Sequence, residues 1–200
     1  MNADNIIAKH NDRFAGWLMA AASVLSVVVM AHHPTGGGDM RLVNGVHGAL
    51  MGLILINIVG FFRFGSGEGL ARLSVSAGLV AYAAGMFGNL LAATINGFAA
   101  PALMARGASK DVLGFAWELN QALAYEAVYA ISAAYVLWGI GLVRRGARAV
   151  GVAGIAAGAA PAALLAAGAL DMHVAGAMII YAAQSAFAFI IGIRMAMTKP

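Results

Sequence analysis

The amino-acid sequence predicts an all-α polytopic membrane protein, a bundle of six transmembrane helices that forms a single domain over residues 1–200. The chain is 62% hydrophobic and only 10% charged, and its mean hydropathy is +0.85. This composition is too apolar for a soluble domain of the same size. Apolar runs of about 20 residues recur along the chain, each long enough to cross a hydrocarbon layer of roughly 30 Å as a helix. Turn-forming residues separate these runs and leave no room for a second domain.

The first two helices are expected on either side of a glycine-rich turn at residues 34–38. The first follows a polar leader that contains Lys9 and Arg13. Because its apolar run is not followed by a small-x-small cleavage motif, we expect a retained anchor and not a cleaved signal peptide. The second helix ends at the glycine- and serine-rich turn at residues 65–69.

The remaining four helices are separated by turns of the same kind. A segment from Pro101 to Gly107 follows the third helix, and Arg144-Arg145-Gly146 follows the fourth. The fifth is rich in alanine and glycine and contains Pro161, which is expected to bend it. A short turn centred on Asp171 leads into the sixth. The six helices are expected near residues 14–31, 45–64, 73–99, 112–142, 149–170 and 173–193.

Lysine and arginine are distributed unevenly between the two sides of this six-helix arrangement. One side holds Lys9, Arg13, Arg63, Arg72, Arg144, Arg145, Arg148, Arg194 and Lys199, and the other holds Arg41, Arg106 and Lys110. By the positive-inside rule, both termini are expected in the cytoplasm. The glycine and alanine content and the lack of organelle signals favour a bacterial inner membrane. The net charge is +4, but the basic residues lie where the positive-inside rule places them in any such protein. We therefore predict no nucleic-acid partner.

The chain contains no cysteine, which excludes disulfides, thiolate metal sites and thiol catalysis. Four of its five histidines, His32, His33, His47 and His173, fall at helix ends on the outward side of the predicted bundle. Neutral imidazole is a common ligand for zinc, copper and iron, so these histidines predict a metal ion or a b-type haem. A haem held by two histidines needs both ligands at the same depth in the membrane, and the predicted helices give two such pairs: His47 with His173, and His47 with His32. The spacing is not that of a known metal motif, since HExxH and HxxxH are both absent.

Carboxylates and amides extend this outward corner into the membrane. Glu126 lies inside an apolar helix, and a carboxylate there has to be protonated, solvated, metal-bound or paired with another helix. Its proposed partners are His47, His173 and Arg41, while Asp171 is the second candidate carboxylate ligand. Helical periodicity also predicts two polar faces: Tyr82, Asn89 and Asn96 on the third helix, and Glu118, Gln121, Tyr125, Tyr129 and Ser132 on the fourth.

The sequence predicts an outward-facing cavity between the first, second, fourth and sixth helices that binds a metal or haem. Two alternatives remain open beside this interpretation. In one, the chain is a cofactor-free sensor or assembly subunit that contacts a membrane-protein partner or a second copy through small-residue faces such as Gly48/Gly52 and Gly154/Gly158. In the other, it is a transporter or membrane hydrolase that uses Glu126. Ligand identity is not predicted, and the lipid bilayer is the expected surrounding.

Overall fold

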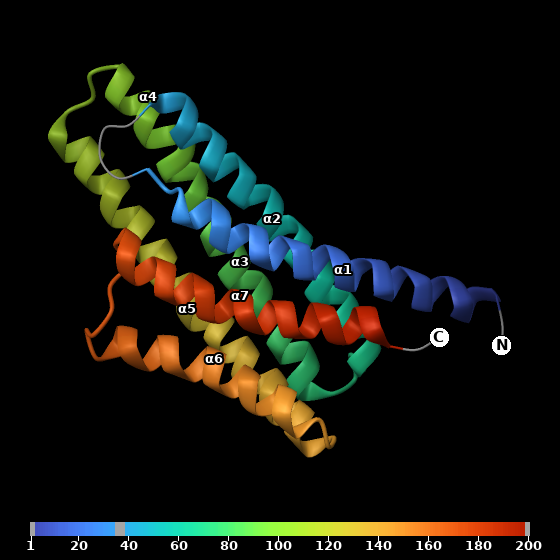
Figure 1. Ribbon diagram of the computed structural model, residues 1–200. Helices are drawn as coiled ribbons and strands as arrows, with labels where there is room; N and C mark the ends of the chain where they lie inside the picture. Colours follow the sequence, from blue (N-terminus) through green and yellow to red (C-terminus); the bar gives the residue numbers. More distant parts are fainter. Residues whose placement is uncertain (1–2, 35–38, 199–200) are drawn as a thin grey trace.

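The computed structural model describes residues 3–34 and 39–198 and confirms an all-α protein, with no strand in that part of the chain. Six helical spans are long and apolar enough to cross a membrane, as expected of a multi-pass membrane protein (Figure 1). The glycine-rich turn at 35–38 and Lys199, both used in the sequence predictions, lie outside the described residues. The helices are α1 (Ala3–Ala31), α2 (Met40–Glu68), α3 (Leu73–Thr94), η1 (Ile95–Ala99), α4 (Ala100–Ala105), α5 (Lys110–Arg144), α6 (Arg148–Ala166) and α7 (Val174–Met197).

Most helices extend beyond their predicted ends, because hydropathy detects only the apolar part of each span. Helix α2 begins five residues before the expected position, where the Asp39 side chain accepts a hydrogen bond of 2.9 Å from the backbone N–H of Arg41. Helix α6, in contrast, ends at Ala166 and not near residue 170. Gly168 explains the early end: it has φ +67°, a left-handed conformation that favours glycine and stops the helix.

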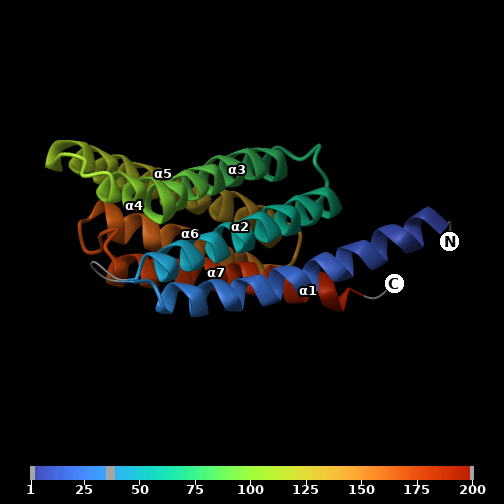
Figure 2. The same ribbon diagram turned by 90° about the horizontal axis from the view of Figure 1, so that it is seen from above.

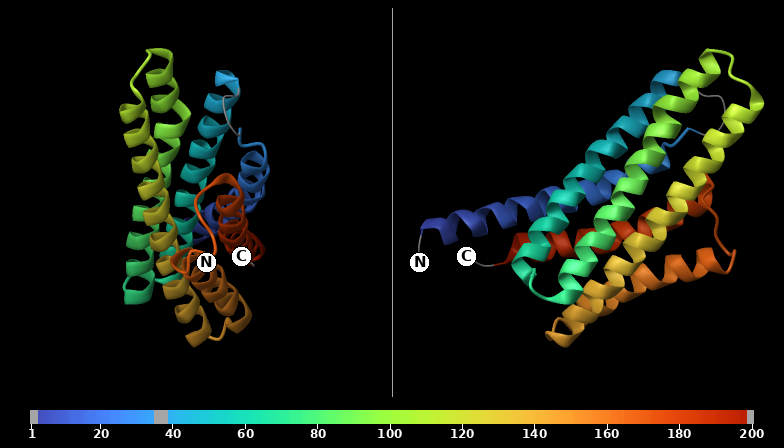
Figure 3. Two further views of the ribbon diagram at one scale, coloured as in Figure 1. Left: turned by 90° about the vertical axis from the view of Figure 1, so that its left-hand side faces the viewer. Right: turned by 180° about the vertical axis from the view of Figure 1, so that it is seen from behind.

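The spans pack side by side, with α1 against α7, α3 against α5, and α5 against α6. Figure 2 shows the same packing from above, and both termini lie at one end of the bundle in both views (Figures 1 and 2). Glycines allow the closest approaches: a Cβ at Gly16 of α1 would lie 2.6 Å from the Gly192 carbonyl oxygen of α7. Figure 3 shows α6 on the outer side of α5, away from α1 and α2.

The centre of the bundle is filled by aromatic side chains in the half nearer the termini. Phe61 stacks on Trp138 with ring centroids 4.8 Å apart, and Tyr82 and Tyr135, which stack on each other at 6.2 Å, both contact this pair. The indole N–H of Trp138 donates to the Val75 carbonyl oxygen at 3.2 Å, so its polar atom is satisfied. The buried polar side chains described below lie on the other side of this aromatic cluster, toward the end of the bundle away from the termini.

The end of the bundle that holds the termini is strongly basic, as the sequence pattern predicts. Glu68 of α2 joins two other helices there through ion pairs with Arg145 of α5 at 2.7 Å and Arg194 of α7 at 2.9 Å. Asp12 pairs with Arg63 at 2.6 Å. Among the described residues at this end, the arginines that pair with carboxylates are therefore Arg63, Arg145 and Arg194.

Candidate functional site

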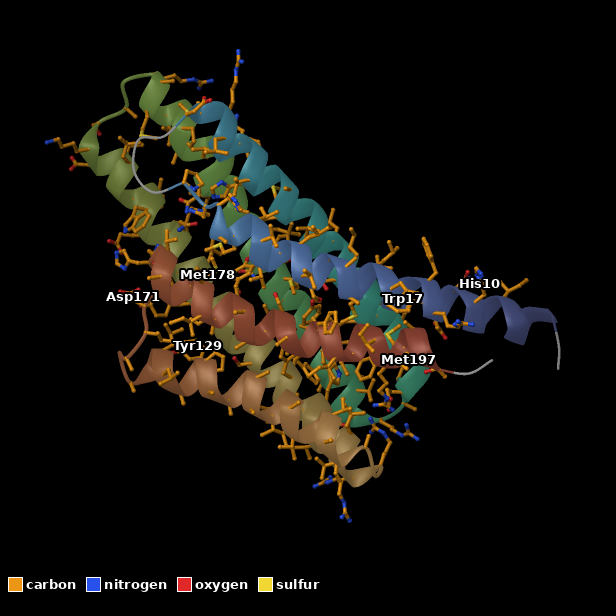
Figure 4. The ribbon with its side chains drawn as sticks, in the orientation of Figure 1. His10, Trp17, Tyr129, Asp171, Met178 and Met197 are labelled. Atoms are coloured by element: carbon orange, nitrogen blue, oxygen red, sulfur yellow. The ribbon has the colours of Figure 1, made fainter. Side chains whose placement is uncertain are left out.

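A cavity of about 290 Å³ opens among the helix ends that lie opposite the termini. Figure 4 shows this end at the left, where Asp171 is labelled, with Met197 and His10 at the other end. We call it the histidine cavity, because three of the four predicted histidines line it. Its polar and sulfur-containing lining residues are Met30, His33, His47, Asn89, Asn96, Trp117, Asn120, Gln121, Met172, His173 and Tyr181.

His33 and His47 form a pair in the wall of this cavity. Their Nε2 atoms are 3.2 Å apart, and the rings meet edge to face with centroids 4.9 Å apart. The Nδ1 atom of His33 lies 3.1 Å from the Pro34 carbonyl oxygen, and that of His47 lies 2.8 Å from the Val43 carbonyl oxygen. A carbonyl oxygen only accepts hydrogen bonds, so both Nδ1 atoms carry the proton. Two neutral rings would therefore place two Nε2 lone pairs 3.2 Å apart, an arrangement that a shared proton or a bound metal cation would stabilise.

A π-helical turn in the third span positions His47. The turn η1 contains Gly97, whose missing side chain makes room for the Cβ of His47. Pro101 lies four residues after Gly97 and has no N–H to donate to the Gly97 carbonyl oxygen. In the orientation that satisfies its amide, Asn44 of α2 donates to that oxygen at 2.7 Å instead. The turn therefore fixes α2 against α3 beside His47, as is common for π-turns near functional sites.

His173 enters the histidine cavity from the turn before α7, held by its predicted neighbour Asp171. The Asp171 carboxylate lies 3.0 Å from the Nδ1 atom of His173 and also accepts the His173 backbone N–H at 3.0 Å. The imidazole lies beside Trp117, with ring centroids 6.0 Å apart. A carboxylate on Nδ1 directs the Nε2 lone pair of His173 outward for binding, an arrangement typical of metal-binding histidines.

Amides supply the remaining polar surface of the histidine cavity. Asn89 and Asn96, predicted on one face of the third helix, both line it, and so does Gln121 of α5. Asn120 is a lining residue that the sequence analysis missed. It is 5% exposed and shares an inward helical face with Ala124, Ala127 and Ile131, so the small-residue periodicity of α5 could have identified it.

A smaller chamber of about 30 Å³ lies deeper in the bundle, and Asn89 and Tyr181 line both spaces. Three polar atoms around this chamber are buried without a hydrogen-bond partner in the described chain: Asn57 Oδ1, Tyr82 Oη and Gln184 Nε2. The polar interior therefore reaches from the histidine cavity to the middle of the bundle and stops at the aromatic cluster. The sequence predicted Tyr82 on this face, but it did not predict Asn57.

Three of the predicted metal ligands, His32, Glu126 and Asp171, do not line the histidine cavity, and of these Asp171 contacts the lining residue His173. His32 is exposed, and its Nδ1 donates back to the Val28 carbonyl oxygen at 2.8 Å. Glu126 is exposed on the outer face of α5, where its carboxylate lies over Gly88 of α3. Of the predicted polar face on α5, Glu118 and Tyr129 are also exposed. The helix is rotated so that Asn120 faces inward in their place.

The donor set of the site is nitrogen, amide oxygen and thioether sulfur. Within residues 3–34 and 39–198, no group of three or more His, Asp or Glu side chains converges on one point, so the His33–His47 pair is the nucleus of any metal site. Burial lowers the pKa of His33, and the neighbouring His47 lowers it further, while the Pro34 carbonyl opposes the shift. A lowered pKa keeps the Nε2 lone pair of His33 available for a cation.

The fold and the cavity define a class: a six-helix multi-pass membrane protein with a cavity lined by histidines and amides. In comparisons with protein-family models, curated proteins and solved structures, nothing matches the chain. The geometry of the cavity is therefore the basis for a functional proposal.

Proposed function

We propose that this chain is a bacterial inner-membrane protein that binds one transition-metal ion in its histidine cavity, through the Nε2 atoms of His33 and His47. The single observation that carries the proposal is that both Nδ1 atoms donate to backbone carbonyls while the two Nε2 atoms face each other at 3.2 Å. Zinc-to-imidazole bonds of about 2.0–2.1 Å in a tetrahedral site separate two ligand nitrogens by about 3.3–3.4 Å. The observed separation is close to that value.

The surroundings of the pair support a bare ion more than a haem. The cavity volume of about 290 Å³ lies at the lower limit of small-molecule sites, which begin at about 300 Å³. A bis-histidine haem also needs its two ligands on opposite faces of the porphyrin, whereas the Nε2 atoms of His33 and His47 are already as close as two ligands of one tetrahedral ion. His173, Met30 and Met172 line the same cavity and are available to complete the coordination. Thioether sulfur favours copper(I), and imidazole suits zinc and copper alike.

The proposed orientation follows from charge. The termini share the basic end of the bundle, so the positive-inside rule supports a cytoplasmic location for that end. The histidine cavity would then open toward the periplasm. A transport role receives less support, because the aromatic cluster around Phe61 and Trp138 fills the bundle between the polar interior and the basic end.

The proposal is tested by metal loading of the detergent-purified chain. The protein is stripped with a chelator, incubated with Zn²⁺ or Cu⁺, desalted and analysed for metal per chain. We expect about one ion per wild-type chain and a large loss of bound metal in His33→Gln. His32→Gln is the matched control, because His32 is the adjacent histidine but lies outside the cavity. Glu126→Gln is a second control and should also bind normally.

Three results would contradict the proposal. One is a wild-type chain that retains neither metal, in which case the His33–His47 pair shares a proton and the cofactor-free alternative gains support. Another is a Soret band in the purified protein, which would assign the cavity to haem. Equal metal loss in His32→Gln and His33→Gln would also show that the cavity is not the binding site.

A further inference from the structure

A groove of about 720 Å³ lies between α3 and α5 at the basic end of the bundle, opposite the histidine cavity. Three arginines, Arg72, Arg144 and Arg145, line it together with the apolar side chains of Leu73, Leu137 and Ile140. Nitrogen-bearing side chains gather at the turns from α2 to α3 and from α5 to α6, which border this region (Figure 4). The groove thus combines positive charge with an apolar wall.

The positive charge of this groove exceeds the carboxylates available to neutralise it. Glu68 is the nearby acid, and both of its oxygens are already used, one by Arg145 and the other by Arg194. Arg72 donates to the backbone carbonyl oxygen of Glu68, which carries no net charge. Across the described residues, Arg72 and Arg144 make no ion pair. Among the described residues, these two guanidinium groups of the groove therefore have no carboxylate partner.

A second cavity at the same end shows the contrast. It has a volume of about 340 Å³ and is lined by three arginines, Arg13, Arg63 and Arg194, together with Asp12 and Glu68. Arg63 pairs with Asp12 at 2.6 Å and Arg194 pairs with Glu68 at 2.9 Å, while Arg13 donates to the Ala196 carbonyl oxygen at 3.2 Å. The second cavity thus has two carboxylates in its lining, whereas the lining of the α3–α5 groove has three arginines and no carboxylate.

The wall of the groove also contains a buried hydrogen-bond donor, Arg145 Nε, that has no acceptor in the described chain. A Cβ at Gly141 would lie only 3.0 Å from Arg145 Nη1 and 3.0 Å from Ser74 Oγ, so the missing side chain of this glycine lets both polar groups pack against α5 in the groove wall. The Nε atom of Arg145 is buried without a partner in the described chain. Buried donors are normally satisfied, and an anionic oxygen beside them would form charge-assisted hydrogen bonds.

We propose that this groove binds the phosphate of an anionic phospholipid, with its acyl chains against Leu73 and Ile140. Leu73 is 81% exposed and Ile140 is 38% exposed, so both present apolar surface that a lipid tail covers and a free phosphate does not. Basic pockets between transmembrane helices are a recognised means of holding anionic headgroups. The proposal is independent of the histidine cavity, which lies at the other end of the bundle.

Native mass spectrometry of the full chain with added lipids tests the proposal. Phosphatidylglycerol is titrated against phosphatidylcholine, which has the same acyl chains but a zwitterionic headgroup. We expect the wild-type chain to retain phosphatidylglycerol preferentially, and the double variant Arg72→Gln/Arg144→Gln to bind it about 30-fold more weakly, at about 1 kcal/mol for each arginine. Arg148→Gln is the matched control: Arg148 is an exposed arginine of the same turn that does not line the groove.

The competing outcomes are distinguishable. Equal retention of the two lipids by the wild-type chain overturns the proposal without the need for any variant. Equal weakening in Arg148→Gln and in the double variant shows only a diffuse attraction of the basic end, and it also overturns the proposal. Displacement of phosphatidylglycerol by millimolar inorganic phosphate would assign the groove to a soluble anion. Because all three results concern the basic end, none of them bears on metal binding by His33 and His47.

Discussion

The Nε2 atoms of His33 and His47 face each other at 3.2 Å, and each ring is held by a hydrogen bond from its own Nδ1 to a backbone carbonyl. This relationship joins the end of α1 to the first turns of α2. Neither ring can turn its protonated nitrogen toward the other without losing its backbone bond. This fixed arrangement supports the proposal that the two Nε2 atoms bind one metal cation.

The pH dependence of metal binding should reflect the lowered pKa of His33. Burial first and His47 second move this pKa below its ordinary value of 6.5, so His33 stays neutral in more acidic solution than a free imidazole. Because a proton on Nε2 excludes the metal, we expect the proton competition from His33 to begin only below about pH 6.5. The affinity should then fall about tenfold per pH unit for each proton displaced. Isothermal titration calorimetry with Zn²⁺ at a series of pH values measures this decrease in affinity. A decrease with its midpoint above pH 6.5 would contradict the assignment of His33 as a metal ligand.

Gly97→Val should destabilise the protein and weaken metal binding together. The new side chain would meet the Cβ of His47, which belongs to a packed helix and has little freedom to move. Overpacking of this kind costs about 1–3 kcal/mol, and the displaced imidazole would lose its alignment with His33. Thermal unfolding in detergent and metal titration measure the two effects. Gly52→Ala is the control, since nothing lies within 4 Å of its Cβ position, and it should leave both quantities unchanged.

Glu68→Gln should reduce stability more than Asp12→Asn. The Glu68 side chain is 14% exposed and joins α2 to both α5 and α7, whereas the Asp12–Arg63 pair is about one-third exposed on both sides. Loss of the Glu68 charge leaves two partly buried arginines without their partner, and we expect a cost of about 2 kcal/mol. The more exposed Asp12 pair should contribute less than about 1 kcal/mol. Equal unfolding temperatures for the two variants would show that Glu68 does not tie these helices together.

Tyr82→Phe should lower stability even though it removes a polar group from the core. Tyr82 is 2% exposed, and its hydroxyl borders the 30 Å³ chamber with Asn57 Oδ1 and Gln184 Nε2, a combination of donors and acceptors suited to one water molecule. Loss of one hydrogen bond to that water should cost about 1 kcal/mol. The exposed Tyr129 provides the control, Tyr129→Phe, with little expected effect. A gain in stability for Tyr82→Phe would indicate a dry chamber.

Hydropathy and turn residues were sufficient to predict the helices, because each membrane span must be apolar over a fixed length. The same topology brought His33, His47 and His173 to one end, where the structure places all three in one cavity. Helix rotation was harder to predict. Glu126 and Asn120 lie on one helix, and only the packing of α5 against α3 determines that Asn120 faces inward while Glu126 is exposed.

The π-turn at Ile95–Ala99 was also beyond sequence periodicity, because it changes the rotation of the helix within one turn. The turn-forming residues from Pro101 to Gly107 predict a loop, but in the structure Pro101 lies in the first turn of the short helix α4. Pro101 has no N–H to donate to the Gly97 carbonyl oxygen, and the side-chain amide of Asn44 donates to this oxygen instead. This relationship cannot be predicted from the sequence, because Asn44 belongs to a different helix.

X-ray absorption spectroscopy of the metal-loaded chain tests the central claim most directly, because it reports the atoms bound to the ion. For the zinc-loaded wild-type chain we predict at least two imidazole nitrogens at about 2.0–2.1 Å. The His33→Gln chain, loaded at the same ratio, should lose the two-imidazole signature, whereas His32→Gln should keep it. A coordination shell made only of oxygen atoms, or one that is the same in all three chains, would contradict metal binding by the His33–His47 pair.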